Sequence, residues 1–186
     1  MALINSRFHH IAWDFLLTCI HVKVNGGEIP SGEEGRVVIA SPWVNDLANR
    51  SLRISSPLLD GVENSSRRSL TSLARVLEVM AYYDMEVFVV TSEPGSNKWK
   101  GNWNQKSIEH DRRFQNRLVA SGVRVRHNEL SHAKSVSTPI GVMDGSANLT
   151  DNGFFKNIEH MHVYDGSHAD FLQARSKINQ LVISDG

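Results

Sequence analysis

Residues 131–159 read SHAKSVSTPIGVMDGSANLTDNGFFKNIE, and this is the most informative stretch of the 186-residue chain. Its start places His132 two positions before Lys134, so that in a β-strand both side chains point to the same side. An imidazole beside an ammonium is a poor structural pair, because burying both destabilises the fold. The same pair suits a phosphate. The imidazole is a nucleophile and proton carrier near neutral pH, and the ammonium neutralises phosphoryl oxygens.

The later part of the stretch adds groups that a phosphate site needs. Gly145 allows a close approach of the backbone, while Ser146 and Asn148 share a face and offer donors to non-bridging oxygens. Glu159 is suited to hold an imidazole in one tautomer and to stabilise its charged form. The candidate catalytic residues are therefore His132, Lys134, Ser146, Asn148 and Glu159.

This constellation resembles the signature of the phospholipase D superfamily, which is His-x-Lys, an Asp five positions after the Lys, and Gly-Ser-x-Asn downstream. Asn157-x-Glu159 matches the usual trailing element, and Ser41-Pro42-Trp43 resembles the end of the family's first core strand. The resemblance covers residues 36–183. It implies an α/β fold, a phospholipase D-like mixed β-sheet flanked by helices on both faces. We expect a single domain over residues 1–186, with an N-terminal helix and loop at 1–35.

One position departs from the family pattern. The family Asp would fall at residue 139, where this chain has Pro139, and the nearby Asp144 is out of register with the motif. In the family that carboxylate is mainly structural, and some nuclease members lack it. An earlier His21-Val22-Lys23 has no Gly-Ser-x-Asn behind it, so we interpret it as a chance match.

The resemblance also implies a mechanism, because two motifs build one active site in this family. One histidine attacks phosphorus to give a phosphohistidine, and the other protonates the leaving oxygen and then activates water. A chain with a single motif can supply both histidines only as a pair of chains meeting at a two-fold axis. We therefore expect a homodimer with the active site at its interface. No metal or cofactor is expected, because the two lysines neutralise the phosphate charge.

The order of apolar runs supports the fold class, since strands alternating with helices are typical of a layered α/β domain. We expect strands at residues 36–40, 85–91, 123–127, 132–138, 140–144 and 158–164. Helices are expected at residues 11–20, 66–83, 107–121 and 168–182, with Ile108, Phe114, Leu118 and Val119 facing inward in the third. The glycine-rich residues 24–35 predict a surface loop.

Basic residues and tryptophans gather in the loop at 92–106. One interpretation is a nucleic-acid groove, with lysines on phosphates and indoles available for stacking, and the other is a surface loop whose tryptophans cap the core. Arg112, Arg113 and Arg117, like Arg124 and Arg126, either extend this groove or form a solvated face. His160 and His162 share a strand face and could ligate a metal, but no third ligand is evident. The candidate substrate-binding residues are Lys98, Trp99, Lys100, Trp103 and Lys106.

Composition narrows the class of protein. Lysines and arginines number 20 and acidic residues also 20, so the net charge is zero and a polyanion would need a local basic patch. A single cysteine, Cys19, fits a reducing compartment, and no signal or membrane segment is evident, so we expect a cytoplasmic protein.

The leading hypothesis is a metal-independent phosphodiesterase, a DNA endonuclease in genome or phage defence, with defence-system subunits as further partners. The alternative is a catalytically weakened DNA-binding or assembly subunit of a defence complex. Phospholipid hydrolysis is a third hypothesis.

Overall fold

Seven strands form one mixed sheet in the computed structural model, which describes residues 2–4, 8–47, 57–66, 69–70, 72–96, 105–129, 132–150, 152–153 and 159–183. The strands are β1 (Ala2–Ile4), β2 (Val37–Ala40), β3 (Val87–Thr91), β4 (Arg124–His127), β5 (Ser135–Ser137), β6 (Gly141–Gly145) and β7 (His160–Asp165). The helices are α1 (Phe8–Val24), α2 (Pro57–Ser66), α3 (Leu73–Tyr82), α4 (Gln105–Ala120) and α6 (Phe171–Ile183), with a 3₁₀ helix η1 (Gly32–Glu34).

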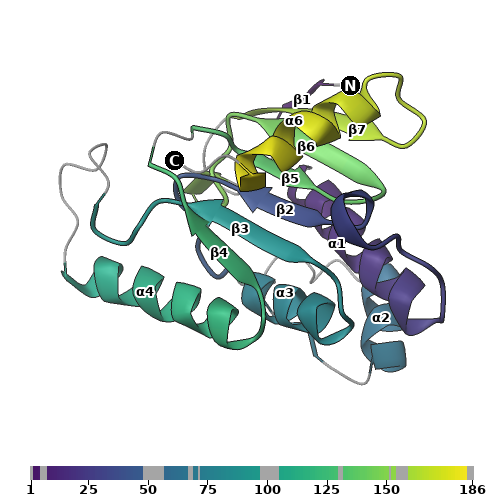
Figure 1. Cartoon of the computed structure of the whole chain (residues 1–186), viewed down its shortest axis with the longest axis horizontal. Helices are drawn as coiled ribbons and strands as arrows, with labels where there is room; N and C mark the ends of the chain where they lie inside the picture. The colour runs from purple at the N-terminus through teal and green to yellow at the C-terminus, as the bar shows by residue number, and fades with distance from the viewer. Residues whose placement is uncertain are drawn as a thin grey trace.

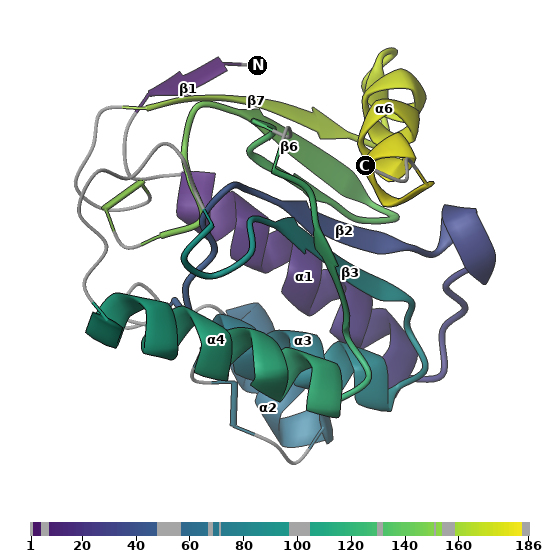
Figure 2. The ribbon, with the colours of Figure 1, turned by 60° about the vertical axis from the view of Figure 1, so that its left-hand side comes forward.

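The strand order is β1-β7-β6-β5-β2-β3-β4. β2 pairs with β3 and β3 with β4 in parallel, while all other neighbours are antiparallel. Helices α1 to α4 lie on one side of the sheet and α6 lies on the other (Figure 1, Figure 2). This arrangement confirms the predicted α/β fold with helices on both faces.

Alternation along the central strands divides the core in two. In β2, Val37 and Ile39 belong to the larger apolar cluster beneath α1 and α3, whereas Val38 and Ala40 belong to the cluster beneath α6. All four side chains are buried, which explains why this strand is an unbroken apolar run. Helix α1 contributes Trp13, Leu16, Leu17 and Ile20 to the larger cluster, so the N-terminal helix is part of the main core. Within the described residues, no helix combines the length and apolar character needed to cross a bilayer.

The helix predicted at residues 66–83 is wrong at its start. It begins at Leu73, where the Ser72 hydroxyl caps it by accepting a hydrogen bond from the Arg75 backbone N–H at 3.4 Å. Leu70 is buried, but it lies before the helix, where the Glu63 carboxylate accepts from its N–H. The separate helix α2, over Pro57–Ser66, was not predicted.

Other differences are smaller. Val119 on α4 is 57% exposed and does not face inward, because the buried stripe of this helix runs through Phe114 and Leu118. Strand β1, which pairs with β7, was not predicted. The closing helix begins at Phe171, three residues later than expected, because the residues before it form a turn.

Candidate phosphate site

The predicted motif residues meet at one end of the central strands. Lys134 directly precedes β5, and its carbonyl accepts from the N–H of Gly145, the last residue of β6, at 3.1 Å. Ser146 follows β6, and its N–H donates to the carbonyl of His160, the first residue of β7, at 2.9 Å. Ala40, the last residue of β2, lies opposite Ser135. The hairpin register therefore brings together residues that are far apart in the sequence.

His132 and Lys134 lie before β5 and not within it, so the strand predicted at residues 132–138 is too long. Their side chains nevertheless meet. The Lys134 Nζ lies 2.9 Å from the His132 Nδ1 and donates to the His132 carbonyl at 2.9 Å. A charged lysine offers only donors, so a ring nitrogen of His132 is the acceptor in this contact.

The ammonium of this pair lies deeper than the imidazole. Lys134 is 6% exposed, whereas His132 is exposed. Burial lowers the pKa of Lys134 below its ordinary value, and the negative charge of Glu159 opposes that shift. The structure therefore keeps a cation under an accessible imidazole. A bound anion would stabilise the charged form of this buried ammonium.

Ser146 and Glu159 form the second contact of the site. The Ser146 hydroxyl donates to a Glu159 carboxylate oxygen at 2.5 Å, and it accepts from the His160 backbone N–H at 3.0 Å. The sequence predicts that Glu159 orients an imidazole. A hydrogen bond of the structure joins Glu159 to the Ser146 hydroxyl, and the contact of Glu159 with an imidazole stays a prediction.

Ser41 is a site residue that sequence reasoning did not single out. It is buried at the end of β2, and its Oγ lies 3.4 Å from the Asn148 Oδ1 and accepts from the Leu149 N–H at 3.3 Å. The same hydroxyl donates to the Trp43 carbonyl at 2.7 Å. The sequence marks Ser41 only as part of Ser41-Pro42-Trp43 at the end of an apolar strand, because Asn148 and Leu149 lie more than a hundred residues away.

Pro139 lies at the opposite end of the β5–β6 hairpin from the motif. The turn is closed by Thr138, whose N–H donates to the Gly141 carbonyl at 2.9 Å and whose hydroxyl accepts from the Gly141 N–H at 3.1 Å. Five residues of roughly 3.3 Å rise each separate Pro139 from Lys134, so the missing carboxylate would lie on the order of 15 Å from the ammonium.

The predicted substrate-binding residues are placed only in part. Lys98, Trp99, Lys100 and Trp103 lie outside the described residues. Lys106 is exposed in the first turn of α4.

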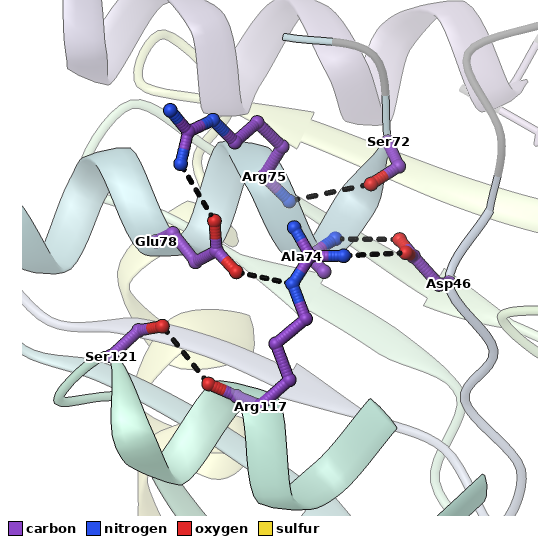
Figure 3. A network of polar contacts seen from close by, with 7 residues as sticks. All are labelled: Asp46, Ser72, Ala74, Arg75, Glu78, Arg117 and Ser121. Carbon is purple, nitrogen blue, oxygen red and sulfur yellow. Dashed lines mark hydrogen bonds and ion pairs between the residues drawn. The ribbon is translucent and has the colours of Figure 1, made fainter. Parts of the chain in front are cut away.

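Arginines on α4 and β4 take part in ion pairs of the scaffold. Arg117 pairs with Glu78 and Asp46, as Figure 3 shows. Arg113 pairs with Glu109, and Arg124 pairs with Glu86. These carboxylates neutralise some of the arginines that the sequence analysis considers as part of a nucleic-acid groove.

The structure also shows where the histidines of two other candidate motifs lie. His160 and His162 are exposed on β7, and within the part of the chain that the structure describes no group of three His, Cys, Asp or Glu side chains is arranged to hold a metal ion. His21 and Lys23 lie in the last turn of α1, where the Asn25 amide contacts the His21 ring.

Comparisons with known proteins bear on the fold. No family model matches the sequence, and no curated protein matches it. Phosphatidylserine synthase from Haemophilus influenzae matches 97% of this chain and 38% of its own length, at 11% identity and a TM-score of 0.51. Polyphosphate kinase from Porphyromonas gingivalis matches 98% of this chain and 25% of its own, at 9% identity and a TM-score of 0.50. The phospholipase D family member Nuc from Salmonella typhimurium covers 98% of this chain and 92% of its own, at 15% identity and a TM-score of 0.48.

The fold is therefore similar to the folds of this synthase and this kinase. At identities this low the likeness concerns the fold alone. The chemistry of the site depends on its own residues.

Proposed function

We propose that this protein is a phosphodiesterase that hydrolyses nucleic acid through a covalent intermediate on His132. The observation that carries the proposal is the buried ammonium of Lys134 in contact with the accessible imidazole of His132. Ser146 and Asn148, at the same end of the sheet, add polar groups suited to non-bridging oxygens. We further propose DNA as the substrate, in a cytoplasmic setting of genome defence.

The first step follows from the contact between the two side chains. A phosphate oxygen that binds the Lys134 ammonium replaces His132 as the acceptor of its hydrogen bonds. The lone pair of the ring nitrogen is then free to attack. That nitrogen attacks phosphorus, forming an N–P bond as the bond from phosphorus to the leaving oxygen breaks. Lys134 needs no metal ion beside it to neutralise the equatorial oxygens.

The leaving oxygen needs a proton, which a second imidazole would supply. The chain has one His-x-Lys motif with Gly-Ser-x-Asn behind it, so we propose that a second copy brings its own His132 across a two-fold axis. That imidazole protonates the leaving oxygen and then removes a proton from water. The water oxygen attacks phosphorus, the N–P bond breaks, and the phosphomonoester is released.

The test compares wild-type protein with His132→Ala on plasmid, on a single-stranded oligonucleotide and on methyl p-nitrophenyl phosphate, all in EDTA. Wild type should release strand ends and p-nitrophenolate. The variant should be slower by roughly 10³-fold or more, because it lacks the nucleophile. Wild type denatured at alkaline pH during turnover of the small ester should carry a methyl phosphoryl group on His132, detected by peptide mass spectrometry, because the N–P bond breaks in acid. Light scattering should give the mass of a dimer.

Two results would overturn the proposal. If both proteins are equally inert on all three substrates, the chain is a binding or assembly subunit. If a strict monomer turns over at the wild-type rate, the shared site is wrong even though the hydrolysis stands.

A further inference from the structure

Ser41 lies beside the candidate site and on the same face of the sheet. Strands β2 and β5 are antiparallel, and continuing their register by one residue beyond the last pair places Ser41 opposite Lys134. Two positions further into these strands, Ile39 and Val136 belong to the larger apolar cluster on the α1 side. Because strand residues alternate between faces, Ser41 and Lys134 are directed to that same side.

Two hydrogen bonds tie the residue after Asn148 to the chain that follows β2. The Leu149 N–H donates to the Ser41 Oγ at 3.3 Å, and the Leu149 carbonyl accepts from the Asn45 N–H at 2.9 Å. Leu149 also forms a parallel bridge with Val44. Leu149 is 1% exposed and Ser41 is 2% exposed, so water competes little for the bond between them. The position of Asn148 is therefore set from the end of β2.

The side chain of Asn148 reaches back toward the same serine. The Ser41 hydroxyl has one proton and two acceptors in reach, the Trp43 carbonyl at 2.7 Å and the Asn148 Oδ1 at 3.4 Å. The nearer carbonyl holds the proton more strongly, so the main restraint on Asn148 comes through the backbone of Leu149. Since Oδ1 faces the serine, the Asn148 Nδ2 points away from it and is the donor left for a phosphoryl oxygen.

Gly153 makes a second close contact with Asn148. A Cβ at this position would overlap the Asn148 carbonyl oxygen and lie 2.9 Å from the Asn148 backbone nitrogen, so the approach requires glycine. The Gly153 N–H donates to the Thr150 Oγ1 at 3.2 Å, and the Thr150 N–H donates to the Asn148 carbonyl at 2.8 Å. The backbone of Asn148 is thus restrained by this turn as well as by β2.

We propose that Ser41 is a positioning residue for Asn148, and that Gly153 is a second one. By fixing the loop, they place the Asn148 Nδ2 to donate to a non-bridging oxygen of a phosphoryl group bound at Lys134. This inference rests on the proposed phosphodiesterase function and adds two residues that act on the reaction only through the Asn148 amide.

The test is a double-mutant cycle in which Ser41→Ala and Asn148→Ala are made singly and together. Ser135→Ala is the matched control, because this serine is 0% exposed, alternates with Lys134 on the strand, and has a hydroxyl that bonds to no described residue. Gly153→Ala is a second variant that keeps every hydroxyl. The kcat and KM on methyl p-nitrophenyl phosphate are measured at a temperature where circular dichroism shows each variant to be folded.

Ser41→Ala should lower kcat roughly tenfold and leave KM within about twofold, because a misplaced donor weakens binding of the transition state more than binding of the substrate. Asn148→Ala should lower kcat on the order of 100-fold, the usual loss for one such donor. In the Asn148→Ala background, Ser41→Ala should change kcat by less than about twofold, since the group that it positions is gone. Gly153→Ala should resemble Ser41→Ala, and Ser135→Ala should leave kcat unchanged.

A measurement without substrate follows the amide itself. In isotope-labelled wild type, the two side-chain N–H protons of Asn148 should give a resolved pair of resonances, assigned by their absence from Asn148→Ala. Ser41→Ala should shift or broaden this pair, whereas Ser135→Ala should not. Inertness of wild type on the small ester would reject the proposed hydrolysis, and the spectrum would still decide whether Ser41 positions the amide.

The inference is overturned if Ser41→Ala keeps the wild-type kcat, or if it lowers kcat equally with and without Asn148, because the serine then serves the fold alone. It is also overturned if Asn148→Ala is as active as wild type, or if the Asn148 resonances do not change in Ser41→Ala. If Ser41→Ala does not fold, Gly153→Ala takes its place in the cycle, and additivity with Asn148→Ala overturns the inference.

Discussion

Two groups of charged side chains differ in the partners of their cations. One group lies on α3, α4 and the chain after β2, and the other lies at the ends of β5, β6 and β7. In the first, which we call the ion network, Arg117 contacts Glu78 at 2.5 Å and Asp46 at 3.3 Å, and Arg75 contacts Glu78 at 2.9 Å (Figure 3). Each cation there meets a carboxylate. In the second, the candidate site, the Lys134 ammonium is hydrogen-bonded to the imidazole and carbonyl of His132.

The difference indicates what each group contributes. The ion network joins the chain after β2 to α3 and α4, because Asp46 also accepts from the Ala74 N–H at 2.9 Å and so caps α3. Its charges are already compensated, and they serve the fold. The buried cation of the candidate site is better compensated when an anion binds. We therefore expect changes in the ion network to lower stability and changes in the site to lower activity.

The largest expected effect tests this separation directly. Lys134→Met should lower kcat/KM on methyl p-nitrophenyl phosphate by roughly 10²–10³-fold, the usual loss for one donor at a developing negative charge. Its melting temperature should not fall, because methionine fills the same space without a buried charge. Calorimetry and the chromogenic assay measure the two quantities. A variant that melts far below wild type would show that Lys134 also serves the fold.

Glu78→Gln should show the opposite pattern. The carboxylate is 12% exposed and binds two arginines, so its loss should lower the free energy of unfolding by about 2 kcal/mol. Activity per folded molecule should stay within about twofold of wild type, since the residue lies outside the candidate site. Urea unfolding followed by circular dichroism gives the stability. An unchanged free energy of unfolding would mean that the ion network is solvated and does not stabilise the fold.

The pH dependence of Glu78→Gln has a defined sign. Burial alone would raise the pKa of Glu78, but the hydrogen bonds from Arg117 and Arg75 outweigh it and hold the pKa below its ordinary value of 4.5. The folded state thus binds fewer protons, and the stability from Glu78 is fully present above pH 4.5 and is lost as the pH falls through the folded value. The stability difference between wild type and variant should therefore shrink on acidification below that pH.

The same comparison separates what the sequence could predict from what it could not. His132, Lys134, Ser146 and Glu159 are close in the sequence and lie at the ends of the neighbouring strands β5, β6 and β7, whose pairing brings them together. The ion network joins residues 71 positions apart, on elements whose sequences carry no sign of each other. Ser41 belongs to the second kind, because its role depends on Asn148 and Leu149 across the sheet.

The errors in helix prediction have a similar origin. Leu70, Leu73 and Leu77 have helical spacing, and all three are buried, but Leu70 reaches the core from the chain before the helix. The helix begins where the Ser72 hydroxyl caps it, which the leucine spacing does not indicate. The apolar side chain of Val119 predicts an inward position, but the residue lies about 100° around α4 from Leu118 and is exposed. Burial is decided by neighbouring elements, which spacing within one helix cannot identify.

The smallest expected effect concerns Pro139, the one residue that departs from the family motif. Since it lies in the hairpin turn at the far end of β5, Pro139→Asp places a carboxylate on the order of 15 Å from Lys134, too far to pair with it. The kcat/KM on the small ester should change by less than about threefold, because a charge in this half-exposed turn is largely screened at that distance. Stability should fall by less than about 1 kcal/mol, the usual consequence of freeing the unfolded chain at a proline. Thr138 continues to close the turn, and so the hairpin register that aligns Lys134 with Gly145 is kept. A gain of tenfold or more in activity would contradict this account, because the turn carboxylate would then act on the site through the hairpin, and the separation of structural from catalytic charges would not hold in this chain.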